Sequence, residues 1–280
     1  MIDPSSHLFE LPRNIPVYFG RSDYVIEYSR GKDVLHLGCV DEGMHELKSQ
    51  AGTWLHGRLA SVTKSLWGVD IDKEGLNWMK EQGLGNLYLE DIEDLTANTE
   101  IIKRRFDLIL LTEVLEHVDN PGKFLKGTLA LFRPGTEMLV TVPNSTSLAN
   151  LIQNWFAREA VHPDHNYWFS LHTIQSLFNK HGYLLDCVGV YCQYNFNRSL
   201  LRYIWSKFTR PFDVRNRKPI TSSDISTVVD PNASHRINIV GWLKVVITTL
   251  TYRIFISRNP FFADGLILIA RPAGQDISGT

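Results

Sequence analysis

Cysteine is scarce in this 280-residue chain: it has three, at positions 39, 187 and 192, and no Cys-x-x-Cys pair. Such a count is too small for a disulfide framework and is typical of a protein kept in a reducing compartment. The first 20 residues also lack the continuous apolar core that a signal peptide needs. We therefore expect a cytoplasmic protein.

Net charge is lacking as well, because the formal charge is −1 at pH 7. A near-neutral chain has no global field that would select nucleic acid or an anionic membrane. Neither an internal repeat nor a low-complexity tract is present. With 44% hydrophobic residues, the chain is large and apolar enough to form one sizeable domain with its own core.

The chain is organised around residues 33–43, where a short apolar strand runs into a glycine. Val34, Leu35 and Leu37 supply the apolar run, and Gly38 ends it at a point of close backbone approach. Residues 65–71 repeat the pattern and reach an acid, Asp70. An acid at the tip of the second strand is what an α/β nucleoside site uses to hold ribose hydroxyls.

Strand-like apolar runs alternate with helical patterns along the chain. We expect strands over 33–38, 65–71, 86–91, 106–111, 138–142, 183–191 and 265–270. Helices are expected over 21–30, 54–60, 73–82, 92–103, 120–132 and 171–181. This alternation predicts an α/β fold with a Rossmann-like, doubly wound sheet of seven strands, mostly parallel. Ligands of such a sheet bind at the carboxyl ends of its strands.

Five motifs in order resemble those of the class I S-adenosylmethionine (SAM)-dependent methyltransferases of the broad small-molecule type. They are residues 34–39, 68–72, 89–92 and 106–118, then 131–136 followed by a strand and Pro143-Asn144. The resemblance covers about residues 30–195 and the final strand, which it implies to be antiparallel. It implies SAM as cofactor, with Asp70 on the ribose and Asp91 at the adenine amino group. The cofactor-binding residues it implies are His36, Gly38, Cys39, Asp70, Ile71, Asp91, Ile92, Thr112 and Glu113.

The glycine turn departs from the pattern of this family. Val40 and Glu42 stand where two further glycines are usual, and Gly43 lies one position late. His36 replaces an acid that helps to orient the methionine ammonium. A reshaped pocket in a SAM-fold binding module without turnover is therefore one alternative. A dinucleotide-binding oxidoreductase is another, but it needs a G-x-G-x-x-G spacing that residues 38–43 do not provide.

Glu113, Glu116 and His117 form an E-x-x-E-H stretch after the fourth strand. On a helical turn these positions share one face and could hold a divalent cation together with His162 or His165. The stretch resembles that of metal-using O-methyltransferases of small-RNA 3′ ends and of the ubiquinone pathway. Many metal-free relatives carry the same letters, so we expect no metal and keep Glu113, Glu116, His117 and His162 as the less favoured set.

Residues 162–170 are rich in polar and aromatic side chains and precede the helix expected over 171–181. In this fold the segment lies over the transferred methyl group. A histidine titrates near pH 6.5 and can take a hydroxyl proton as the methyl moves. We therefore expect His165, with His117, to be the catalytic residues, whereas Ser170 is expected to be a helix N-cap.

Residues 196–262 form an insertion between the last two strands. Over 198–258 it has eleven Lys and Arg residues against three Asp residues, beside several aromatic residues. A membrane-spanning helix over 237–256 is not favoured, because two cations fall inside it. Core helices, a substrate lid, a dimer surface or a peripheral contact with an anionic partner such as a membrane remain open.

The sequence thus predicts a SAM-dependent methyltransferase, with O-methylation of a small molecule or glycan as the favoured reaction. Its expected domains are a lead-in and helix over 1–30, a cofactor-binding domain over 31–195 and 263–272, and the insertion. An RNA or metal-dependent O-methyltransferase is the alternative, although nucleic acid is a less favoured partner because no dedicated motif is present. The sequence leaves the oligomeric state open.

Overall fold

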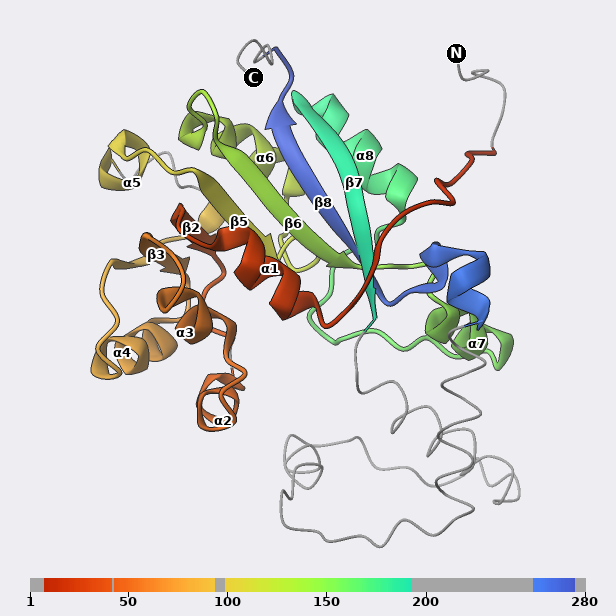
Figure 1. Cartoon of the computed structure of the whole chain (residues 1–280), viewed down its shortest axis with the longest axis horizontal. Helices are drawn as coiled ribbons and strands as arrows, with labels where there is room; N and C mark the ends of the chain where they lie inside the picture. The colour runs from red at the N-terminus through yellow and green to blue at the C-terminus, as the bar shows by residue number, and fades with distance from the viewer. Residues whose placement is uncertain (1–7, 42, 94–98, 193–253, 275–280) are drawn as a thin grey trace, which may run out of the picture. The chain divides into compact units, whose positions relative to one another are not determined.

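The computed structural model describes residues 8–41, 43–93, 99–192 and 254–274. In these residues a single eight-stranded sheet forms the centre of the fold (Figure 1). Its strands run across the sheet in the order β1 (Val17–Phe19), β7 (Tyr183–Cys192), β8 (Gly265–Pro272), β6 (Glu137–Pro143), β5 (Leu108–Thr112), β2 (Asp33–Leu37), β3 (Ser65–Asp70) and β4 (Leu87–Leu89).

The chain changes direction across the sheet next to β2. It first builds outward through β3 and β4, and then returns to add β5 and β6 on the other side of β2. All of these pairings are parallel, with His36 opposite Gly68 on one side and Leu110 on the other. The switch point is therefore between β2 and β5, and a ligand is expected beyond their carboxyl ends.

The last strand, β8, lies antiparallel between β6 and β7. The sequence-based prediction of a Rossmann-like, mostly parallel sheet with an antiparallel last strand is confirmed. The number of strands was predicted as seven, whereas eight are present in the described residues. The additional strand is β1, which pairs parallel with the outer edge of β7.

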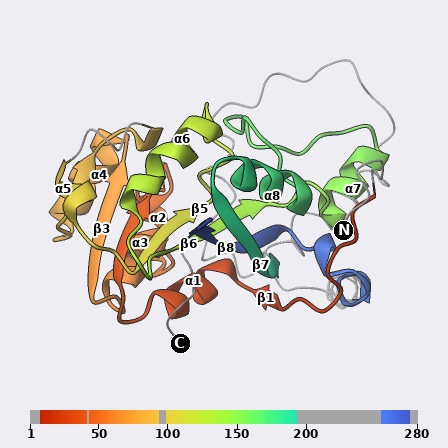
Figure 2. The same ribbon diagram turned by 90° about the horizontal axis from the view of Figure 1, so that it is seen from above.

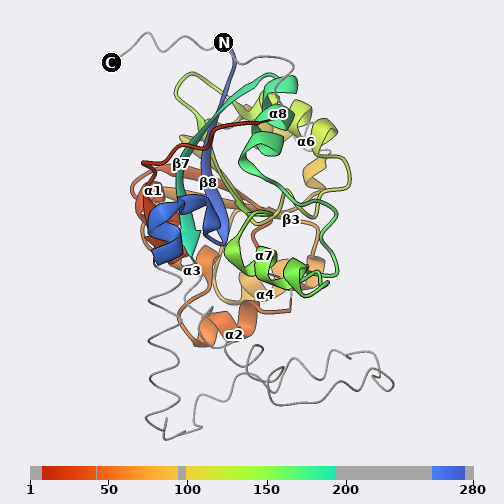
Figure 3. The same ribbon diagram turned by 90° about the vertical axis from the view of Figure 1, so that its right-hand side faces the viewer.

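Helices cover both faces of the sheet (Figures 2 and 3). On one face α1 (Arg21–Ser29) and α3 (Leu55–Ala60) pack their buried aliphatic side chains on β2, β5 and β8. On the other face lie α6 (Pro121–Thr128), continued by a 3₁₀ turn over Leu129–Leu131, and α8 (Leu171–Lys180). Because β5 is enclosed on both faces, all five of its residues are buried, as its uninterrupted apolar sequence predicts.

The helix after β3, α4 (Lys73–Glu81), begins at Asp72, whose Oδ1 accepts a hydrogen bond from Gly75 N at 3.0 Å. Leu76 and Met79 on this helix pack against Trp54 and Val40 in a second apolar cluster. This packing holds the loop after β2 against α4.

Three short elements were not predicted from the sequence: β1, α2 (His45–Gln50) and α7 (Leu148–Trp155). The helix expected over 92–103 is described only as α5 (Thr99–Lys103) and a 3₁₀ turn at 92–93. Strand β1 is three residues long, and α2 buries no residue, so neither produces a periodic apolar pattern.

The chain divides into two units, residues 1–193 with 259–280, and residues 194–258. Most of the insertion expected over 196–262 lies outside the described residues. The roles considered for it from the sequence therefore stay predictions. The described end of the insertion includes a 3₁₀ turn at Pro260–Phe262. Among the described residues, none of the helices has the length and apolar character required to cross a bilayer.

Candidate functional site

The turn after β2 is shaped by Gly38. Its φ is +67°, a left-handed conformation that favours glycine, and its N–H donates to Val69 O at 2.9 Å. A Cβ atom at this position would lie 2.4 Å from Cγ2 of Val114, which follows β5. The turn after β2 is therefore in direct contact with the turn after β5, at the switch point of the sheet.

Asp70 at the end of β3 fixes the next residues of this turn. Its Oδ2 accepts the N–H of Val40 at 2.8 Å, and its Oδ1 accepts the N–H of Asp72 at 3.0 Å. Burial raises the pKa of Asp70, while the hydrogen bonds from the backbone partly oppose this shift. Asp70 thus joins the carboxyl ends of β2 and β3.

Asp91 lies just beyond β4, the neighbour of β3. Its side chain is exposed, with Oδ1 accepting the N–H of Glu93 at 2.8 Å. Beside these two acids, Ile71 is 70% exposed and Leu89 is 50% exposed. Ile92, which follows Asp91, is half-buried. Two acids therefore flank exposed aliphatic side chains at adjacent strand ends.

His36 is buried within the fold. It is 3% exposed, with Nδ1 3.1 Å from Nδ1 of His56 on α3 and Nε2 3.4 Å from Oγ1 of Thr112. Burial lowers the pKa of His36 well below its usual range, with further lowering by His56 and Arg21. Cys39 is 2% exposed, and burial raises the pKa of its thiol well above the usual value. His36, Cys39 and Thr112 therefore lie beneath the turn.

The E-x-x-E-H stretch is a tight turn rather than the helical turn that was expected. Glu113 has a φ of +56°, and His117 N donates to Val114 O at 3.0 Å. Oε1 of Glu113 accepts from the hydroxyl of Tyr191 at 2.9 Å and lies 3.1 Å from Nη1 of Arg21. The left-handed residue directs Glu113 toward β7 and α1, so the shared helical face on which the cation set was based does not form.

Glu116 is 1% exposed, and neither of its carboxylate oxygens has a hydrogen-bond partner among the described residues. Burial raises its pKa to about 7. Its backbone oxygen is occupied, because it accepts the N–H groups of Asn166 at 2.8 Å and Tyr167 at 3.1 Å. The segment over 162–167 is thereby held against the turn after β5.

Three histidines meet where this segment lies on the turn. One ring nitrogen from each of His117, His162 and His165 lies within 4.8 Å of the others. His117 and His162 are exposed, and His165 is half-buried. Burial and the two neighbouring histidines lower the pKa of His165 to about 4. The structure therefore brings the two histidines expected to be catalytic next to each other and adds His162.

A family profile described as a methyltransferase domain matches residues 22–188, which is more than half of the chain. The chain belongs to the methyltransferase-domain family. The resemblance to class I SAM-dependent methyltransferases predicted from the five motifs is confirmed.

Curated relatives of this methyltransferase domain include ubiquinone biosynthesis O-methyltransferases. The Coxiella burnetii protein is 32% identical over 123 residues, which are 44% of this chain and 48% of the relative. That of Haemophilus ducreyi is 32% identical over 128 residues, 44% of this chain and 50% of the relative. The chain thus spans about half the length of these relatives.

Among solved structures, the small RNA methyltransferase HEN1 has a TM-score of 0.50 and 16% identity, over 90% of this chain and 25% of that one. A SAM-dependent methyltransferase from Archaeoglobus fulgidus has a TM-score of 0.47 and 16% identity, over 89% of this chain and 90% of that one. At such identities, the likeness to HEN1 shows the fold alone.

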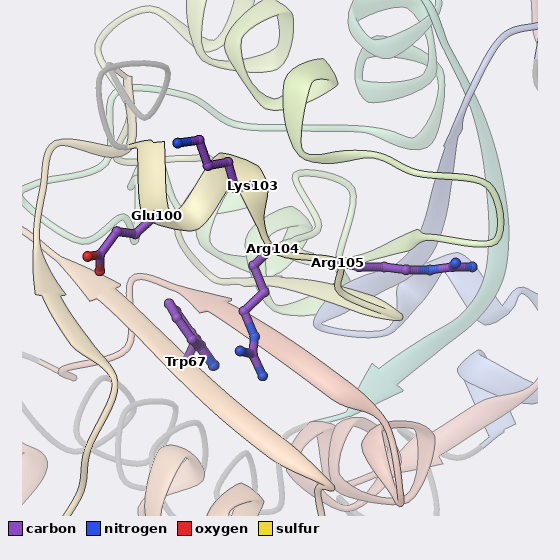
Figure 4. A pocket seen from close by; sticks show the side chains of 5 residues that line it. All are labelled: Trp67, Glu100, Lys103, Arg104 and Arg105. Atoms are coloured by element: carbon purple, nitrogen blue, oxygen red, sulfur yellow. The ribbon is translucent and has the colours of Figure 1, made fainter.

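A surface pocket of the methyltransferase domain lies away from this site (Figure 4). It is lined by Trp67, Glu100, Lys103, Arg104 and Arg105. The Arg104 guanidinium lies 4.5 Å from the Trp67 ring centre, whereas Lys103 and Arg105 point away from it. Because Arg104 and Arg105 precede β5, the pocket lies toward the amino ends of the strands, and its cations do not converge on a ligand.

Three residues of the methyltransferase site were not foreseen from the sequence: His56, Arg21 and Tyr191. His56 lies on the helix expected over 54–60, and Tyr191 lies at the end of a predicted strand. Arg21 is the first residue of α1, and the partners of all three residues come from distant parts of the chain, so their polar contacts leave no local pattern. Ser170 is the N-cap of α8, as expected, and forms a capping box with Thr173.

Proposed function

We propose that this chain is a SAM-dependent O-methyltransferase that acts on a hydroxyl group of a small molecule or glycan. The observation that carries the proposal is the bond from Val40 N to Asp70 Oδ2, which joins the turn after β2 to the acid at the end of β3. The family membership supports SAM as cofactor, and the names of the curated relatives support O-methylation.

Asp70 would accept the ribose hydroxyls. Its oxygens accept backbone N–H groups from Val40, Asp72 and Ile71, and a carboxylate has about four lone-pair positions, so some acceptor capacity remains. Asp91 would accept the adenine amino group, with the exposed side chains of Ile71 and Leu89 beside the adenine ring. Gly38 would keep the backbone close to the methionine portion, and Glu113 would border it from the turn after β5.

The cofactor would supply a methyl group already activated on a sulfonium. The protein must then hold the acceptor oxygen in line with that methyl group and exclude water, and such placement accounts for much of the rate enhancement. The acceptor hydroxyl would have to give up its proton as it accepts the methyl group, either to His165, the base expected from the sequence, or to solvent. The segment over 162–167 lies next to the turn after β5, where it can border the acceptor.

Calorimetry with SAM and with its demethylated product tests the cofactor part of the proposal. We expect one site per chain, with binding weakened when Asp70 is replaced. Absence of binding by the parent protein would contradict the proposal. Incubation with labelled SAM and separate pools of phenols, glycans and short RNA then tests the acceptor class. Label transfer to RNA alone would contradict the small-molecule acceptor, and binding without transfer to any pool would favour a non-catalytic module.

A further inference from the structure

The three histidines at the carboxyl edge form a compact cluster from two distant parts of the chain. His162 and His165 are three residues apart in a turn closed by a hydrogen bond from His165 N to His162 O at 3.1 Å. His117 follows β5. The ring centres of His117 and His165 are 4.5 Å apart, those of His162 and His165 are 5.4 Å apart, and those of His117 and His162 are 5.9 Å apart.

The backbone around this cluster is held in place. Asn166 Nδ2 donates to His117 O at 2.9 Å and to Asp119 Oδ1 at 3.0 Å, and the Tyr167 hydroxyl donates to Asp119 O at 3.0 Å. Together with the two bonds to Glu116 O, these contacts fasten the loop to the turn after β5. The backbone next to His117 and His165 is therefore held by hydrogen bonds that do not involve the side chains of His162 or His165.

One ring nitrogen of His117 is held by a backbone carbonyl group. Its Nδ1 lies 3.1 Å from the backbone oxygen of Asp164, so Nδ1 carries the proton and donates. The lone pair is then on Nε2. Metal-binding histidines commonly donate the second ring N–H to a carbonyl or carboxylate in this way. The ring of His162 is exposed, and its Nδ1 accepts a long hydrogen bond from Asp164 N at 3.4 Å and lies 3.6 Å from Asp164 Oδ2.

The distances allow a shared ion. In a tetrahedral site with metal–nitrogen bonds of about 2.0–2.1 Å, the ligand nitrogens are roughly 3.4 Å apart. The three histidine nitrogens lie within 4.8 Å of one another, so each distance between them must shorten by about 1.4 Å or less. Small side-chain rotations of the exposed His117 and His162 rings can supply this movement. The cluster needs no rearrangement of the backbone.

We propose that His117, His162 and His165 form a binding site for one divalent transition-metal ion, of which Zn²⁺ is the reference case. This set differs from the carboxylate-rich set suggested by the E-x-x-E-H letters, because Glu113 is engaged by Arg21 and Tyr191. Three imidazoles favour Zn²⁺, Co²⁺ or Ni²⁺, whereas Mg²⁺ prefers oxygen ligands. A site with three protein ligands leaves a fourth position for water or a substrate oxygen.

The metal site would also affect catalysis. This consequence rests on the proposed methyltransferase function, whereas metal binding itself is independent of that function. An acceptor hydroxyl at the fourth position would bind through oxygen, and the metal would lower its pKa. The hydroxyl proton would pass to solvent, and the oxygen would form its bond to the methyl carbon as the carbon–sulfur bond breaks. His165 would then be a ligand and not the general base.

The test is a metal titration of the full chain, prepared without a polyhistidine tag and stripped of metal. Zn²⁺ is titrated in competition with a chromophoric chelator, and Co²⁺ binding is followed by its visible spectrum, which distinguishes four-coordinate from six-coordinate ions. We expect one equivalent of Zn²⁺ and a four-coordinate Co²⁺ spectrum. Mg²⁺ in large excess should not compete.

Loss of a residue that only hydrogen-bonds to a metal ligand typically weakens metal binding by roughly 10–100-fold. We expect a larger loss of Zn²⁺ affinity from each single substitution, His117→Ala, His162→Ala and His165→Ala, because each removes a ligand. His172→Ala is the matched control, because His172 is exposed and stacks on Phe9 rather than on the cluster. The double variant His162→Ala/His165→Ala removes no hydrogen bond from the turn after β5, so it keeps the test valid if His117→Ala does not fold.

Equal Zn²⁺ affinity of the parent and the double variant would overturn the proposal, as would absence of stoichiometric binding by the parent. Loss of binding in Glu113→Gln, with competition by Mg²⁺, would show a carboxylate site and would also overturn it. Binding of the demethylated cofactor product is measured on the same samples. Because it should be unchanged in the double variant, failure of the metal site can be distinguished from failure of the proposed function.

Discussion

Nδ1 of His36 lies 3.1 Å from Nδ1 of His56, in the buried layer between β2 and α3. One of the two nitrogens must carry the proton and the other must accept it. A second proton on this pair would place an unpaired charge in the core, and burial lowers the pKa of His56 to about 3. The pair therefore stabilises the fold only while it is neutral.

The pH dependence of stability should reflect this pair. Between the folded pKa of about 3 and the unfolded value of about 6.5, the unfolded state binds a proton at His56 that the folded state does not. The contribution of His56 to the free energy of unfolding is thus fully present above pH 6.5. It falls as the pH decreases, by about 1.4 kcal/mol per pH unit. Urea unfolding at pH 7.5 and 5.5 measures it.

His56→Asn should reduce this pH dependence, because asparagine can occupy the position of Nδ1 without titrating. His172→Ala should keep the parent slope, since His172 is exposed. An unchanged slope in His56→Asn would show that other groups cause the acid sensitivity.

Gly38 and Gly31 offer a matched pair for testing the glycine turn. Both have positive φ, +67° and +70°, but a Cβ at Gly38 would meet Val114, whereas a Cβ at Gly31 would have no atom within 4 Å. Gly31→Ala should cost about 1–2 kcal/mol of unfolding free energy through the backbone alone. Gly38→Ala should cost roughly 1–3 kcal/mol more through overpacking and should also weaken binding of the cofactor product. Equal losses in both properties would disprove the contact.

Asp70→Ala should weaken SAM binding by about 10–150-fold, since a hydrogen bond to a charged group contributes about 1.5–3 kcal/mol. Calorimetry measures the affinity. The control is Asp107→Ala, because Asp107 Oδ2 also accepts a backbone N–H, from Asp33 at 3.0 Å, but at the amino end of β5. A similar loss of affinity in both variants would mean that Asp70 acts through general stability.

Tyr191→Phe should weaken binding of the cofactor product by about 3–10-fold, because Glu113 then loses one of its two partners. Tyr183→Phe is the control: both tyrosines are 1% exposed, but the Tyr183 hydroxyl bonds to Leu125 O at 2.9 Å and to Thr128 at 2.8 Å. Both variants should melt at lower temperature. If Tyr183→Phe also weakens binding, Glu113 has no special role.

All strands except β1 could be predicted from the sequence, because an apolar run marks each of them, even in β4, which is as short as β1 but is followed by two acids, Glu90 and Asp91. Leu108–Thr112 is the clearest example, since a strand buried on both faces must be apolar throughout. Val17–Phe19 could not be found in this way. Its three residues are held by pairing with the end of β7, and such long-range contacts leave no local pattern.

The candidate site could likewise be predicted only in part. Gly38 and Asp70 were expected at the carboxyl ends of two successive strands, because alternating strands and helices predict a parallel sheet. The partners of Glu113 depend instead on its left-handed φ of +56°, which an i, i+3, i+4 argument cannot anticipate. His36 was expected beside the cofactor, but its neighbours His56 and Thr112 come from elements whose packing the sequence does not specify.

Strand β1 has a further consequence for the behaviour of this protein in concentrated solution. It forms one edge of the sheet in the described residues and covers the end of β7, with Val190 N also donating to Pro16 O at 3.0 Å. An uncovered strand edge offers unpaired backbone groups to a second molecule and promotes aggregation. This three-residue strand, bounded by a proline and a glycine, therefore protects part of the β7 edge from self-association.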